Sequence, residues 1–207
     1  GETLPTEEEL IAIMDNANQE EVEPYEEFVS DEPILSELPK AGSVKKQKQL
    51  DIFDATEITL SNGIRVIIKP TDFKQDEILM TSYSLGGTST MSLDDATTIN
   101  VINELSTIGG LGNFSATDLP KVLAGKKVSV TPYIGNMTYG LRGSCSPKDL
   151  ETMMQIMYLY LTDTRYDEEA FKSFITRYQA MLENMANDPM STLQDSLSAL
   201  LFDSHPF

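Results

Sequence analysis

The sequence has no tryptophan, one cysteine and one histidine among its 207 residues. The histidine, His205, stands in the terminal SHPF. Catalysis by a serine or cysteine nucleophile needs a histidine beside the nucleophile, so this count argues against both classes. The cysteine, Cys145, cannot form an internal disulfide and is interpreted as a packed, unreactive thiol.

Basic residues and long apolar runs are also scarce. Fifteen Lys and Arg stand against 33 Asp and Glu, which gives a formal net charge of −18. Such a chain should bind neither a nucleic-acid backbone nor an anionic membrane surface through general electrostatics. No apolar run approaches the roughly 18 residues of a membrane span. The hydrophobic share of 40% is nevertheless enough to build a core.

The acid is concentrated at the front of the chain. Residues 1–39 contain thirteen Asp and Glu and no base, and AGSVKKQKQ then has the composition of a linker. Thr6-Glu7-Glu8-Glu9 is a capping box, which predicts a short helix over 7–17. We therefore predict an acidic connector over 1–50 and a domain over 51–207. Because the chain begins Gly-Glu without a leader, we expect it to be part of a longer protein.

From Glu57 onward the pattern is that of short strands and grouped helices. Asn62-Gly63 predicts a two-residue hairpin turn, and Ser146-Pro147 predicts a helix start. The expected order is βββααββααα, which favours an α+β fold with an antiparallel sheet and helices on one face. The expected strands lie within 57–70, 78–87, 127–134 and 137–143, and the expected helices within 92–108, 115–125, 146–163, 167–187 and from 188 onward.

Two sequence features have structural explanations. The glycine cluster at 109–112 follows a helix rather than a strand and lacks the residues of a phosphate-binding loop, so it predicts a chain reversal. Asp94 and Asp95 stand in a first helical turn, where carboxylates complement the helix dipole.

One helical turn has the spacing of a zinc-peptidase site. In H-x-x-E-H enzymes two histidines one turn apart hold zinc, and the glutamate between them activates a water. Here the five positions read NVINE, from Asn100 to Glu104. An asparagine amide is a poor zinc ligand, and Asn103 cannot accept a proton from water. The residues alone therefore indicate a polar patch on an otherwise apolar helix.

The run from about 58 to 207 resembles the pitrilysin or insulinase-like (M16) zinc peptidases, and most closely the non-catalytic third repeat of their long, four-repeat members. The fold that this resemblance implies is that of the LuxS/MPP-like metallohydrolases, an antiparallel sheet covered by helices on one face. The motifs that carry the resemblance are LSNGIRVIIKPTDFKQDEI, SLGGTST, GGLGNFSATDLPKVLAGKKVSVTPYI, LRGSCSPKDLETMMQIMYLYLTDTRYDEEAF and SHPF.

The resemblance assigns positions to the lost site. It implies that Asn100 and Glu104 stand where the two histidines would be, and that Asn103 stands at the general base. Glu183 falls at the third-ligand position, and Thr176 at another position where active members keep an acid. The resemblance therefore implies no catalytic and no metal-binding residue in this chain, only vestigial positions.

The resemblance also implies a role. In this family two halves close around a chamber and one repeat cuts, while the other repeats shape the chamber and bind substrate. We expect a non-catalytic chamber domain of a zinc metalloendopeptidase, with its zinc in a different domain of the parent. The expected partners are other repeats of the same polypeptide and a peptide substrate, in the periplasm or outside the cell. We also expect the repeat to continue past the HPF position.

Two other functions remain open at this point. Glu104 and Glu183, with Asp94 or Asp95, could form a hydrolase site with a carboxylate-bound Mg²⁺ or Ca²⁺. Alternatively, the chain is a free-standing acidic interaction module.

Overall fold

The computed structural model describes residues 5–19, 32–99 and 101–201, and its contacts divide the chain into two units, 1–30 and 31–207. In the first unit the described residues 5–19 include α1 (Glu7–Gln19), as the capping box predicts. The Thr6 amide donates to the Glu9 carboxylate at 2.8 Å, and the Glu9 amide donates to the Thr6 hydroxyl at 3.3 Å. These bonds, the backbone one first, lower the pKa of Glu9.

The second unit begins with a three-stranded antiparallel sheet in the order β1-β2-β3. The predicted hairpin at Asn62-Gly63 is confirmed, because it joins β2 (Ala55–Leu60) to β3 (Arg65–Ile68) with Gly63 at φ 89°. The linker expected over AGSVKKQKQ was wrong in part. Residues 44–49 of this stretch belong to β1 (Val44–Leu50), which pairs with the full length of β2.

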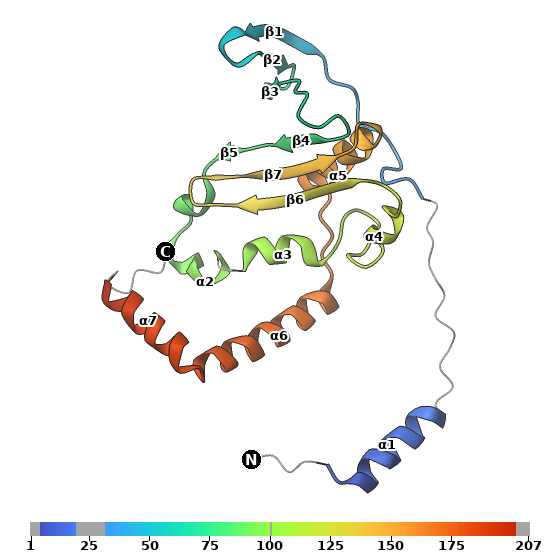
Figure 1. Cartoon of the computed structure of the whole chain (residues 1–207), viewed down its shortest axis with the longest axis vertical. Coiled ribbons are helices and arrows are strands. Elements are labelled where there is room, and N and C mark those ends of the chain that lie inside the picture. The colour runs from blue at the N-terminus through green and yellow to red at the C-terminus, as the bar shows by residue number, and fades with distance from the viewer. Residues whose placement is uncertain (1–4, 20–31, 100, 202–207) are drawn as a thin grey trace. The chain divides into compact units, whose positions relative to one another are not determined.

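The second sheet is built around β7 (Thr138–Cys145) (Figure 1). β6 (Val128–Ile134) pairs with one side of β7, as the second predicted hairpin requires. The other side pairs with β4 (Ile78–Thr81) and then β5 (Ser84–Leu85), so the strand expected over 78–87 is interrupted. The hydroxyl of Ser82 bridges the interruption by accepting from the amide of Leu141 at 2.9 Å.

Helix α5 (Leu150–Thr162) covers one face of this sheet. One buried core cluster consists of Leu111, Ile156 and Leu159, and Val128 and Val130 of β6 pack against it. The alternate β6 residues, Ser129 and Thr131, are exposed. The predicted α+β class is thus confirmed, with α5 on one face of an antiparallel sheet and polar side chains on the other.

The helix predicted after Ser92 is divided. A short turn at 93–95 precedes α2 (Ala96–Ile99), and α3 (Ile102–Ile108) follows. The glycine cluster then reverses the chain, as predicted. A Cβ at Gly109 would fall against the carbonyl oxygen of Arg165, and Gly110 adopts φ 92°. The next helix, α4 (Leu119–Val122), is short.

The chain ends in two further helices, α6 (Glu168–Ala186) and α7 (Pro189–Leu201). Asp167 caps α6 by accepting from the amide of Ala170 at 3.0 Å. Phe174 is the one described α6 residue that is fully buried, and no described residue of α7 is. No helix in the described part of the chain is long and apolar enough to cross a bilayer.

Candidate functional site

The described part of the NVINE turn lies on α3, beside the outer edge of β6. The Asn103 side-chain amide donates to the carbonyl oxygen of Ile134 at 3.0 Å, and its oxygen accepts from the amide of Ile134 at 2.7 Å. Both hydrogen-bonding functions of the side chain are therefore used by one backbone residue 31 positions away. This contact is the best-defined polar feature of the turn.

Glu104 stands next to Asn103 and is exposed. Its backbone amide donates to Val101 and its carbonyl accepts from the Thr107 hydroxyl at 3.0 Å. No described side chain pairs with its carboxylate. Asn100, the other vestigial position of this turn, and His205 lie outside the described residues.

Glu183 is an exposed residue of α6. It follows the buried Phe174 by nine positions, which is two and a half helical turns, so the two side chains leave opposite faces of the helix. Met181 and Met185, seven and eleven positions after Phe174, share its face. No described hydrogen bond or ion pair joins Glu183 to Asn103 or Glu104. Thr176 is also exposed, and its hydroxyl donates to the carbonyl of Lys172 at 3.0 Å.

These positions do not fit a zinc ion. A catalytic zinc site needs three protein ligands, usually imidazole, thiolate or carboxylate groups. Of the two histidine positions only Glu104 is described, and it offers a single exposed carboxylate, while Glu183 lies on the face of α6 away from Phe174. Across residues 5–19, 32–99 and 101–201, no three His, Cys, Asp or Glu side chains are grouped to hold a metal. The carboxylates of the alternative hydrolase site are likewise not brought together there.

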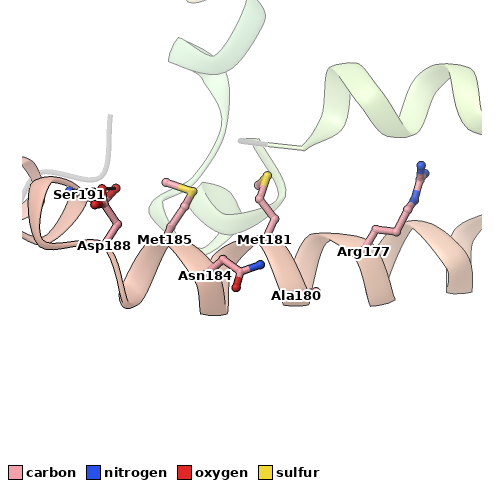
Figure 2. A pocket seen from close by; sticks show the side chains of 7 residues that line it. All are labelled: Arg177, Ala180, Met181, Asn184, Met185, Asp188 and Ser191. Carbon is pink, nitrogen blue, oxygen red and sulfur yellow. Dashed lines mark hydrogen bonds between the residues drawn. The ribbon is translucent and has the colours of Figure 1, made fainter. Parts of the chain in front are cut away.

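An open groove of about 560 Å³ runs along α6 and the start of α7 (Figure 2). Met181 and Met185 give it an apolar floor, with Arg177 at one end and Asp188 at the other. The Ser191 hydroxyl and amide donate to Asp188 at 2.8 and 2.9 Å, and these bonds lower the pKa of Asp188. Asp188 therefore acts as the N-terminal cap of α7, and its hydrogen bonds with Ser191 have a structural explanation.

The sequence pattern singled out Asn103 but could not supply its role. The partner of its side chain is the last residue of β6, and that contact depends on how the sheet and α3 pack. A polar patch on an otherwise apolar helix was the one available signal.

Comparison with known proteins finds similarity to two zinc proteases. The "Zinc protease PQQL-like" of Arabidopsis thaliana is 26% identical over 195 residues, which cover 93% of this chain. The "Probable zinc protease PqqL" of Haemophilus influenzae is 23% identical over 137 residues, or 64% of this chain. The chain is similar in sequence to PqqL-type zinc proteases. No protein-family model matches the sequence.

Solved structures of the PqqL type agree with the fold. The periplasmic protease PqqL from Escherichia coli matches 95% of this chain with a TM-score of 0.69 and 16% identity. A variant of the ferredoxin protease FusC, solved with Arabidopsis ferredoxin, matches 97% with a TM-score of 0.68 and 16% identity. The chain spans only 18% and 14% of the two curated PqqL-type relatives and 22% of each of these structures.

Proposed function

We propose that this chain is a non-catalytic repeat of a larger PqqL-type zinc protease. The observation that supports the proposal is the pair of hydrogen bonds that the Asn103 side chain forms with the backbone of Ile134. At the position that the family resemblance assigns to the general base, the side chain is an amide, and both its donor and its acceptor are bonded to Ile134. A general base must accept a proton from water, and an amide cannot do so.

The likeness supports a structural role in a larger assembly. It extends over most of this chain but over about a fifth of the relatives, so the relatives have room for several such units. In the proposed role the repeat lines a substrate chamber and contacts other repeats of its polypeptide. The zinc and the residues that cut the peptide belong to a different repeat.

The proposed substrate is a peptide or protein, and the proposed location is outside the cytoplasm. Both follow from the relatives rather than from residues of this chain. The E. coli relative is named a periplasmic protease, and FusC was solved with ferredoxin.

A peptidase assay tests the proposal. The purified chain is incubated with added zinc and a mixture of fluorogenic peptides, beside the Glu104→Gln variant and the matched control Glu151→Gln on α5. We expect no cleavage by any of the three proteins. Cleavage by the wild type and the Glu151 control, but not by the Glu104 variant, would contradict the proposal.

A further inference from the structure

Strand β6 pairs with β7 along one side, and its other side is the outer edge of the sheet. The amide of Gly135 donates to Thr138 at 2.9 Å, which makes this the last inward-bonded pair of the β6–β7 hairpin. Inward and outward groups alternate along an antiparallel strand. The backbone groups that point away from β7 are therefore the N–H and carbonyl groups of Val128, Val130 and Ile134 and the carbonyl of Pro132. Among the described elements, none adds a strand to this edge.

Two features close the end of this edge. Pro132 has no N–H, and proline is tolerated in sheets mainly at such edges. At Ile134, Asn103 donates to the carbonyl and accepts from the amide. These are the same two hydrogen bonds, one donated and one accepted, that a residue of a neighbouring antiparallel strand would form with Ile134. Exposed strand edges invite pairing with other chains unless they are blocked.

We propose that Asn103 is an edge cap, which takes the place of a strand at Ile134, closes this end of β6 to strand addition and fixes α3 against the sheet. Helix α3 depends on such a bond because it is seven residues long, has no fully buried residue and has no side-chain cap at its N-terminus. The inference stands on the two hydrogen bonds and does not rest on the proposed function.

The edge cap and a catalytic base exclude each other at this position. An ionised carboxylate is an acceptor only, so it can accept from the amide of Ile134 but repels its carbonyl oxygen. A protonated carboxyl can donate again. The carbonyl of Ile134 should therefore raise the pKa of an aspartate at position 103. Such an aspartate should act as an edge cap only in its neutral form.

The first test needs no variant. Hydrogen exchange of the full chain, followed residue by residue by NMR, compares the amides of Ile134 and Val130. Both point outward, but among the described residues only Ile134 has an outward partner. We expect the Ile134 amide to exchange at least about tenfold more slowly, the ratio that corresponds to one net hydrogen bond. Equal exchange rates would overturn the proposal.

The second test is a pH profile of Asn103→Asp, with Asn184→Asp on α6 as the matched control. Asn184 is exposed and makes no described side-chain hydrogen bond. In thermal unfolding, the Asn103→Asp deficit should be small below about pH 4, where a free Asp is protonated, and should grow as pH rises through the raised folded pKa. The control should show no such growth. A pH-independent deficit, or the same profile in both variants, would overturn the proposal.

Discussion

At the scale of single residues, Asp149 holds the turn between β7 and α5. It is 6% exposed and accepts from the Ser146 hydroxyl at 2.6 Å and from the backbone amide of Lys127 at 2.9 Å. The hydroxyl first and the amide second lower the pKa of its carboxyl. The ionised form is therefore the form that the fold stabilises.

This arrangement predicts an acid-dependent stability. A group whose folded pKa is depressed contributes stability above its ordinary pKa and loses it as pH falls through the folded value. We expect Asp149→Asn to lower the melting temperature at pH 7, and the difference from wild type to narrow below the ordinary value of 3.8. Thermal melts followed by circular dichroism, from neutral to acidic pH, measure this difference in melting temperature. A difference that stays constant with pH would show that the carboxylate charge is irrelevant there.

The glycine reversal predicts a second residue-scale effect. Gly110 has φ 92°, and a Cβ there would fall against the carbonyl oxygen of Phe114. Gly125 has φ 78°, but a Cβ there would meet nothing within 4 Å. Both alanine variants incur the left-handed backbone cost of about 1–2 kcal/mol, and only Gly110→Ala adds a clash. Gly110→Ala should therefore have the lower denaturation midpoint, and equal midpoints would contradict this.

At the scale of elements, the sequence predicted the features that depend on neighbouring residues, but it did not predict pairing between residues distant in the sequence. The capping box at Thr6 and the turn at Asn62-Gly63 depend on residues close in sequence, and each predicted its element. Strand β1 was missed because VKKQKQL has no apolar alternation, and it is a strand because it pairs with β2. The role of Asn103 was missed for the same reason, since its partner is Ile134.

The domain boundary at residue 50 stays a prediction, and deletions test it. Removing residues 1–43 keeps β1, whereas removing 1–50 exposes the edge of β2. The loss of a paired strand should cost at least about 1 kcal/mol, which lowers the melting temperature by about 2–4 °C in a chain of this size. We expect the longer deletion to melt lower than the shorter one. If the two deletion variants have the same melting temperature, β1 does not stabilise the domain and the boundary at residue 50 holds.

The vestigial turn predicts the outcome of rebuilding the zinc site. Asn100→His, Asn103→Glu and Glu104→His together restore H-x-x-E-H on this helix. Because Glu183 leaves the face of α6 opposite Phe174, we expect Glu183→Ala to leave any zinc affinity of this triple variant unchanged. Isothermal titration with zinc measures it. A tenfold or greater loss of affinity would show that Glu183 reaches the rebuilt site.

At the scale of the whole molecule, the acid and the likeness point to one part of a larger protein. Thirteen of the 33 acidic residues and none of the basic residues stand before Lys40. Helices α6 and α7 carry apolar side chains that the described residues leave exposed, including Met181, Met185 and Leu193. The chain as a whole is similar to about a fifth of its PqqL-type relatives. This partial coverage is consistent with the proposed role as one repeat of a larger protein.

The central claim is that this repeat carries no zinc. Its most direct test is the metal content of the purified chain after dialysis against zinc and then against buffer, measured by plasma mass spectrometry beside Glu104→Gln. We predict far less than one zinc per chain in both proteins, because no three His, Cys, Asp or Glu side chains of the described residues are grouped to hold a metal. One zinc per wild-type chain that is lost in Glu104→Gln would contradict the account.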